Sequence, residues 1–369
     1  MEQAPPIAAA KRQFPCKNCG ADLVFEPGKD CMVCPHCGTE NEIPKSPPGA
    51  VQEEDFHAML ASLETSADIQ DTLTIKCTSC GAESQFAGDV VSNKCPFCGA
   101  PIVATAQSKK QIKPKSLLPF KVTKDHASAA FRGWVASLWF APSALARTAE
   151  RSNIDGAYIP AWTYDSDTTS QYTGERGDHY WDTETYTETD ANGNTVTRTR
   201  QVQKTRWSYA SGQVFNQFDD VLVLASNSLP KKIANRLEPW DLQNLVPYRD
   251  EYLSGFVAES YQVDLPEGFE IARGIMDTTI RQLVTRDIGG DEQRISSVNT
   301  QYDNITFKHT LLPLWISAYR YQERVYRFLV NARTGEVQGE RPYSIVKIVL
   351  LILAIVLIIV GIVLIAHRR

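Results

Sequence analysis

Eight of the nine cysteines form two sets with the same spacing. In each set, two Cys-x-x-Cys pairs are separated by fourteen residues: Cys16 and Cys19 with Cys34 and Cys37, then Cys77 and Cys80 with Cys95 and Cys98. A structural Zn²⁺ ion takes four thiolates in a tetrahedron and leaves no open position. Two residues between paired cysteines allow a tight turn that directs both sulfurs at one ion. The spacing therefore predicts two structural zinc ions, one for each set.

The two sets belong to a longer internal repeat. Each cysteine of the first set lies 61 positions before its counterpart, and Gly20 matches Gly81 while Pro35 matches Pro96. The second cysteine of every pair is followed by glycine, which has no Cβ and suits the backbone conformation of such a turn. We therefore predict tandem zinc ribbons at residues 1–43 and 73–104. Each is too small for a stable core, so metal binding is expected to supply much of its folding energy.

Cys31 forms a competing Cys-x-x-Cys pair with Cys34. Because glycine follows Cys37 but not Cys34, the repeat favours Cys37 as the ligand. Cys31 stays open as a substitute ligand or a redox-exposed thiol. His36 lies inside a turn, where a solvent-facing spacer is favoured over a ligand. Two disulfide-bonded domains are the alternative, which the lack of a secretory signal before the cysteines disfavours.

The other end of the chain predicts a membrane anchor. Ile348 to Ala366 is nineteen residues without a charged or polar side chain. A bilayer core of about 30 Å needs about 20 such residues in a helix. We expect a transmembrane helix at residues 345–366 and a tail at 367–369. Residues 1–13 contain no apolar segment that would export the chain, and zinc requires reduced thiols. The sequence thus favours a tail-anchored, single-pass protein of the inner or plasma membrane with its bulk in the cytoplasm.

The charge balance disfavours nucleic-acid binding. The 369-residue chain has a formal net charge of −5, and the basic and acidic residues of the second ribbon are equal in number. A surface without a cationic face gains little from counterion release. Four lysines do lie in residues 105–115, namely Lys109, Lys110, Lys113 and Lys115. A solvated basic linker is favoured there over a set of phosphate contacts.

The remaining segments predict an α+β protein that is rich in β-structure. Residues 44–72 read as a linker with a short amphipathic helix between Glu53 and Glu64, and residues 116–344 as one β-rich domain. We expect three helices in that domain, at residues 124–139, at 228–237 and from Asp264 to Gly289-Gly290. We expect strands at 117–122, 304–314, 315–322 and 324–331. Residues 157–164 contain a proline, so we expect an edge strand or a bulge there.

A charged hairpin is expected around Asn192-Gly193. Its first arm carries Asp182, Glu184, Glu188 and Asp190, and its second carries Arg198, Arg200, Lys204 and Arg206. All eight have even numbers, so each arm keeps its charges on one face. An odd-length loop would place acids opposite bases. A solvated ribbon that resists edge pairing is favoured, with a cation site or a docking surface as the alternative.

We find no catalytic constellation, which favours a protein that is not an enzyme. There is no P-loop, no G-x-S-x-G elbow and no H-E-x-x-H motif. The six histidines are scattered. Only His309 is a candidate site residue among them, and a hydrogen-bonded structural role is favoured for it.

Several segments resemble a family of bacterial membrane proteins. They include Trp139-Phe140-Ala141-Pro142-Ser143, Tyr158 to Tyr164, Asn299 to Tyr302 and Gly335 to Pro342. That family is described as TFIIB-type zinc-ribbon proteins, or as primosomal protein N′ (replication factor Y), superfamily II helicase. The architecture is also similar to YdjG-like proteins, and this similarity implies membrane-stress systems with SPFH-type partners. The resemblance brings no catalytic residue, and the helicase label finds no motor motif here.

The sequence is compatible with three functions. The favoured one is a non-enzymatic adaptor or scaffold that presents protein-docking surfaces at the cytoplasmic face of a membrane. The second is a zinc-ribbon protein that binds nucleic acid. The third is an enzyme or a ligand-binding domain within residues 116–344. The partner and the oligomeric state are not predicted.

Overall fold

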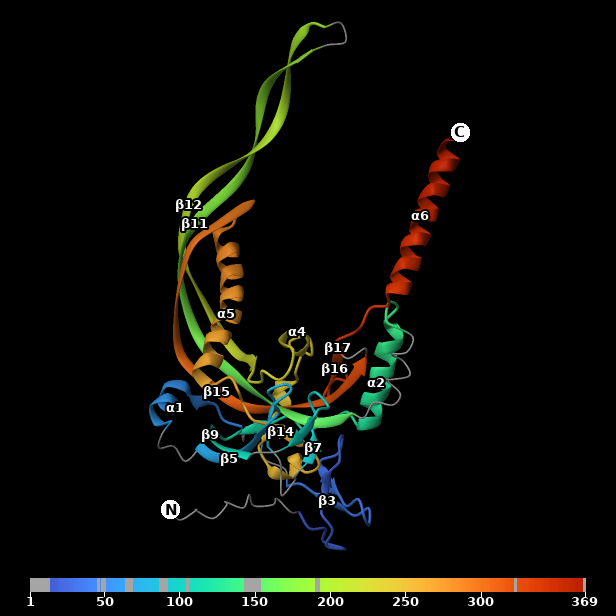
Figure 1. Ribbon diagram of the computed structural model, residues 1–369. Coiled ribbons are helices and arrows are strands. Elements are labelled where there is room, and N and C mark those ends of the chain that lie inside the picture. Colours follow the sequence, from blue (N-terminus) through green and yellow to red (C-terminus); the bar gives the residue numbers. More distant parts are fainter. Residues whose placement is uncertain are drawn as a thin grey trace, which may run out of the picture.

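The computed structural model describes residues 14–44, 47, 51–63, 69–85, 92–103, 106–142, 154–189, 193–321 and 324–367. The chain is a mixed α+β protein with one large sheet, two four-cysteine clusters near its N-terminus and one apolar helix at its C-terminus (Figure 1).

Three long strands form the curved centre of the fold. They are β11 (Asp155–Thr189), β12 (Thr195–Leu224) and β15 (Glu292–Tyr321), and β11 lies between the other two, antiparallel to both. Helix α5 (Leu265–Ile288) lies in the concave side of this sheet, and the β11–β12 hairpin continues far beyond it (Figure 1).

The sequence of α5 explains its two ends and its buried face. The Asp264 side chain accepts a hydrogen bond from the Glu267 backbone N–H at 2.9 Å, which satisfies a donor of the first turn. Gly289 ends the helix with a φ of 64°. Phe269, Met276 and other apolar residues recur on one face and pack on the sheet. The predicted helix is confirmed at both ends.

Strand β11 corrects one expectation, because Pro160 lies in a central strand and not at an edge. The Pro160 carbonyl accepts a hydrogen bond from the N–H of Ala225, just beyond the end of β12. In an antiparallel pair the N and the carbonyl of one residue point to the same side. An N–H at Pro160 would therefore face the Ala225 carbonyl. That carbonyl accepts a hydrogen bond from the N–H of Gln262 at 2.8 Å instead, so the missing donor leaves no acceptor unsatisfied there.

Short elements complete the sheet and its cover. The strands are β4 (Glu54–Asp55), β10 (Ser116–Leu117), β13 (Val246–Pro247), β14 (Val257–Glu259), β16 (Arg324–Asn331) and β17 (Val337–Gly339). The helices are α1 (Phe56–Ser62), α2 (Lys124–Ser137), α4 (Lys231–Ala234), η1 (Leu242–Asn244) and η2 (Asp250–Leu253). The helices expected at 53–64, 124–139 and 228–237 are thus present within shorter bounds. The strand expected at 117–122 is reduced to β10, and the two expected at 304–322 are parts of β15.

The N-terminal repeats build two different substructures. β1 (Val24–Phe25), β2 (Cys31–Val33) and β3 (Glu40–Glu42) form a small sheet of their own. In the second repeat, β5 (Ile69–Lys76) and β6 (Glu83–Gln85) instead join the large sheet through β14, while β7 (Ser92–Lys94) and β8 (Pro101–Val103) form a separate hairpin. The second ribbon is therefore continuous with the β-rich body.

The expected basic linker at residues 105–115 is largely a strand. β9 (Ala106–Ile112) pairs along β5 and is the last strand on that edge of the sheet. Lys109 pairs with the buried carboxylate of Glu83 at 2.5 Å, and Lys115 pairs with Glu54 at 3.0 Å. The sequence of this strand, Ala-Gln-Ser-Lys-Lys-Gln-Ile, has the polar composition of a linker, and its pairing with β5 is what makes it a strand.

The predicted charged hairpin is confirmed in its register. From Ser166 to Thr189, β11 pairs with residues of equal parity on β12, and Glu184 lies directly opposite Arg200. Their side chains are 3.3 Å apart, and the diagonal pairs Asp182–Lys204 and Glu188–Arg198 are at 2.7 and 3.2 Å. Asp190 and Asn192 lie outside the described residues.

Candidate metal centres

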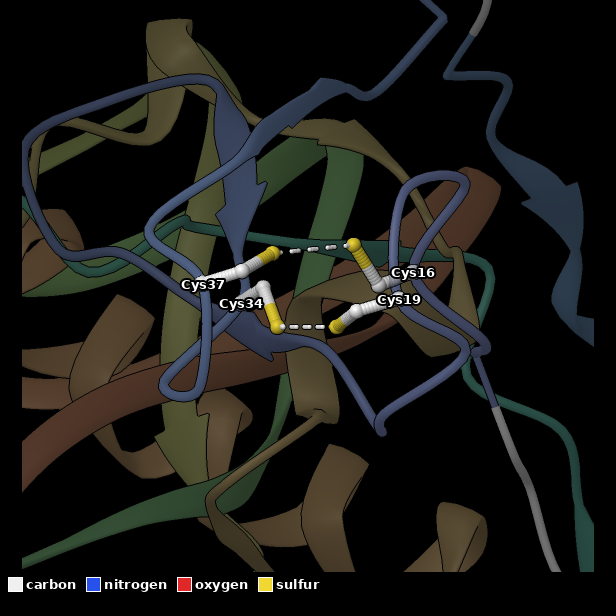
Figure 2. A group of neighbouring side chains, drawn as sticks. All are labelled: Cys16, Cys19, Cys34 and Cys37. Carbon is white, nitrogen blue, oxygen red and sulfur yellow. Dashed lines mark hydrogen bonds between the residues drawn. The ribbon is translucent and has the colours of Figure 1, made fainter.

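The first four predicted ligands come together in one cluster. The sulfurs of Cys16, Cys19, Cys34 and Cys37 all lie within 4.8 Å of one another. Figure 2 shows the four side chains converging from two turns, with Sγ–Sγ separations of 3.7 Å for Cys16–Cys37 and 3.5 Å for Cys19–Cys34. Tetrahedral Zn–S bonds of about 2.3 Å would set sulfurs about 3.8 Å apart, whereas a disulfide needs about 2.05 Å. The cluster therefore suits a metal ion and contains no disulfide.

Glycine makes each turn of this cluster possible. The N–H of Gly20 donates to the Cys16 carbonyl at 2.9 Å, and the N–H of Gly38 donates to the Cys34 carbonyl at the same distance. Their φ angles are 76° and 72°, in the left-handed region that favours glycine. The backbone N–H of Asn18 also points at the Cys16 sulfur, 3.4 Å away, as a donor to a thiolate would.

The second cluster repeats this geometry in a more buried setting. Cys77, Cys80, Cys95 and Cys98 also lie within 4.8 Å of one another, with Cys77–Cys98 and Cys80–Cys95 both at 3.7 Å. In the first cluster Cys19 and Cys37 are exposed, whereas in the second only Cys80 is partly exposed. The two four-cysteine clusters are compatible with two structural zinc ions.

The electrostatics of both clusters are compatible with a bound cation. Hydrogen bonds from Thr39 lower the pKa of Cys37 to about 5, and a hydrogen bond from Cys95 lowers the pKa of Cys80 to about 5. The ionised neighbour and burial raise the pKa of Cys95. Four adjacent thiols cannot all ionise without a compensating charge. A divalent cation supplies that charge, and zinc binds thiolates of this kind.

Cys31 lies on β2, outside the cluster of Figure 2. It is buried, and burial raises the pKa of its thiol. The structure thus brings together the eight cysteines that the repeat selects and leaves the ninth apart.

Both ribbons are packed against the β-rich body. In the first, the ring of Phe25 meets Tyr252 edge-on at 5.2 Å, and the N–H of Phe25 donates to the Ser254 carbonyl at 3.1 Å. In the second, Phe97 has no exposed surface and packs in a cluster with Leu229 and Leu237. Phe97 occupies the repeat position of His36, which is exposed in the first ribbon.

A carboxylate cluster that the sequence analysis missed has its own positive charge. Glu53, Asp165 and Asp219 lie close enough together to suggest a cation. The Lys308 ammonium lies 3.0 Å from Glu53 of this group and 2.8 Å from the neighbouring carboxylate of Asp220. Lys308 is almost fully buried, so this contact supplies its counter-charge. We assign no metal to this group.

His309 is buried and hydrogen-bonded, as the structural role that the sequence favours would require. Its Nδ1–H donates to the Ile112 carbonyl at 2.9 Å, and its ring lies 4.5 Å from that of Trp162. Burial lowers the pKa of this histidine to about 4, so the ring is neutral at neutral pH.

In the part of the chain that the structure describes, the hydrogen bonds between the C-terminal helix and the body lie at its first turn. α6 (Ile345–His367) is almost entirely apolar, and its apolar side chains are exposed. Its 23 residues are long and apolar enough to cross a membrane. The N–H of Ser344 donates to the Phe140 carbonyl at 2.7 Å, and the Lys347 ammonium donates to the Ala141 carbonyl at 2.8 Å. These bonds tie the base of α6 to the end of α2.

No family model and no solved structure matches the chain. The chain is similar to the uncharacterized protein YdjG of Bacillus subtilis (strain 168), with 24% identity over 343 residues that cover 90% of each protein. The resemblance to YdjG-like proteins is thereby supported over nearly the whole chain. No match supports the TFIIB-type zinc-ribbon family or its primosomal label.

Proposed function

We propose that this protein is a tail-anchored adaptor, without enzymatic activity, that holds cytosolic protein partners at the inner face of the plasma membrane. The observation that carries the proposal is the position of the two clusters: both are packed on a body that is bonded to the base of an exposed apolar helix. A zinc-stabilised surface on that body is tethered to the membrane, and tethering raises the effective concentration of bound partners.

The two ribbons suit different tasks in such an adaptor. The second cluster is buried, and its strands continue the main sheet, so its zinc would stabilise the body. The first ribbon exposes its turns, including Lys17, Asn18 and His36, on a metal-stiffened loop. We assign partner docking to these exposed turns. The similarity to YdjG-like proteins suggests membrane-stress or SPFH-type systems as the place to look for the partners.

Nucleic-acid binding receives less support than protein docking. Of the basic run, Lys109 and Lys115 are engaged by Glu83 and Glu54, so that much of its charge is balanced within the protein. A duplex would have to break these pairs before it gained from phosphate contacts.

The experiment compares partners recovered with the full-length protein from detergent-solubilised membranes, with and without a zinc chelator. A Lys17→Glu, His36→Glu variant tests the exposed turns, and Lys121→Glu, an exposed change on the body, is the matched control. We expect the chelator and the double variant to remove the same partners, with two zinc ions retained in both variants. Recovery of an unchanged set of partners after chelation would refute a docking role for the ribbons.

A further inference from the structure

The outer half of the β11–β12 hairpin has two edges that no other strand covers. β15 pairs with β11 only as far as Gly177, and β12 pairs with β11 alone, in the part of the chain that the structure describes. Residues 178–189 and 195–206 therefore form a two-stranded ribbon that stands away from the body (Figure 1). The backbone N–H of His179 is engaged by Asp291, at the base of this ribbon. Beyond it, the backbone N–H of Thr183 donates to the Asp182 side chain at 2.9 Å. The other outward-facing backbone groups of the two edges have no strand partner among the described residues, and such groups invite another strand.

The charges of this ribbon are separated by arm. Residues 178–189 of β11 contain acids and no lysine or arginine: Asp178, Asp182, Glu184 and Glu188. Residues 195–206 of β12 contain bases and no aspartate or glutamate: Arg198, Arg200, Lys204 and Arg206. All eight lie on one face, because the register pairs even-numbered residues with even-numbered residues. The acids and bases pair with each other across the hairpin, and each arm carries a single sign of charge beside its open edge.

The separation of charges between the two arms favours one kind of partner, a second copy of the same hairpin. A second hairpin in the same orientation places its β11 beside β12 of the first, antiparallel to it, so that acids meet bases across the new contact. If two β12 edges met instead, arginine and lysine would face arginine and lysine, which is repulsive. We propose that copies of this chain associate through the outer hairpin, the basic β12 edge of one copy pairing with the acidic β11 edge of the next.

Figure 1 shows the outer hairpin and α6 leaving the body on the same side, so we infer the pairing from the hairpin alone and not from the anchor. Each contact leaves a free acidic edge at one end and a free basic edge at the other. Such heterologous contacts close into a ring when the rotation between copies permits, and otherwise extend as a filament.

Charge exchange tests the proposal in the full-length protein. A first variant carries Asp182→Lys, Glu184→Lys and Glu188→Lys, so that both arms are mainly basic. A second variant carries Arg198→Glu, Arg200→Glu and Lys204→Glu, so that both arms are mainly acidic. A six-substitution variant combines both sets, which exchanges the arms and restores complementarity within and between hairpins. The mass of the protein in detergent is measured by light scattering at low salt and at high salt.

We expect wild type to exceed the mass of one chain at low salt and to approach it at high salt, because salt screens exposed charge pairs. Each three-substitution variant should have the mass of one chain by itself, and the two should form mixed oligomers when combined. The six-substitution variant should regain the wild-type mass. The mixture is the decisive arm, because it repairs only the contact between copies and not the repulsion inside each hairpin.

Either of two results would overturn the proposal: wild type with the mass of one chain at low salt, or three-substitution variants that keep the wild-type mass. Zinc content and the thermal unfolding of the body report whether each variant is folded. Membrane fractionation and partner recovery are measured separately, so a failure of hairpin pairing is distinguishable from a failure of the adaptor function.

Discussion

Phe97 offers a sharp test of how the second ribbon is held, because the repeat supplies its own control. Phe97 has no exposed surface and packs with Leu229 and Leu237, whereas its counterpart His36 lies in solvent. A buried phenylalanine removes about 200 Å² from water, which at about 25 cal/mol/Å² corresponds to about 5 kcal/mol as an upper estimate. Substitutions of buried phenylalanine by alanine cost about 3–5 kcal/mol in practice. We therefore expect Phe97→Ala to lower the free energy of unfolding by about 3–5 kcal/mol.

The control substitution, His36→Ala, should change the free energy of unfolding by less than about 0.5 kcal/mol, since this substitution removes an exposed side chain. Denaturant unfolding of the full-length protein in detergent measures both, and a chromogenic chelator measures the rate of zinc release. Phe97→Ala should speed zinc release from the second cluster, because that cluster is held in shape by its packing on the body. Equal and small effects of the two substitutions would show that the second ribbon is not packed as described.

Three further predictions concern the metal, the buried histidine and the anchor. Purified protein should carry two zinc ions per chain, as measured by metal analysis. The Cys31→Ser variant should keep both ions, and the Cys80→Ser variant should keep one. Loss of an ion from Cys31→Ser would contradict the ligand assignment. Burial lowers the pKa of His309 from 6.5 to about 4. Between these two pH values the unfolded chain therefore binds a proton at His309 that the folded chain does not bind. The free energy of unfolding should therefore fall by about 3 kcal/mol as the pH drops from 6.5 to 4, at about 1.36 kcal/mol per pH unit. Denaturant titrations at several pH values measure this fall, and His309→Gln should remove that part of the pH dependence. A chain that ends at Ser344 should leave the membrane fraction, and its retention there would show that α6 is not the anchor.

Local sequence determines the metal clusters and the ends of several elements. The Cys-x-x-Cys-Gly turns are decided by residues next to one another, since glycine alone readily accepts the φ of about 70–80° found after each pair. The capping of α5 by Asp264 and the register of the hairpin, with Glu184 opposite Arg200, are also local and can be predicted. The length and the apolar character of α6 can be predicted from the composition of residues 345–367 alone.

Tertiary structure decided how those parts are joined. Pro160 is accommodated in a central strand because the Ala225 carbonyl accepts its hydrogen bond from Gln262, and no residue near Pro160 indicates that contact. Residues 106–112 form an edge strand because β5, more than thirty positions earlier, offers a partner. The burial of Phe97 depends on Leu229 and Leu237, which lie far along the chain. Contacts of this range arise from which surfaces meet after folding, so periodicity and spacing within a short window determine the pieces and not their packing.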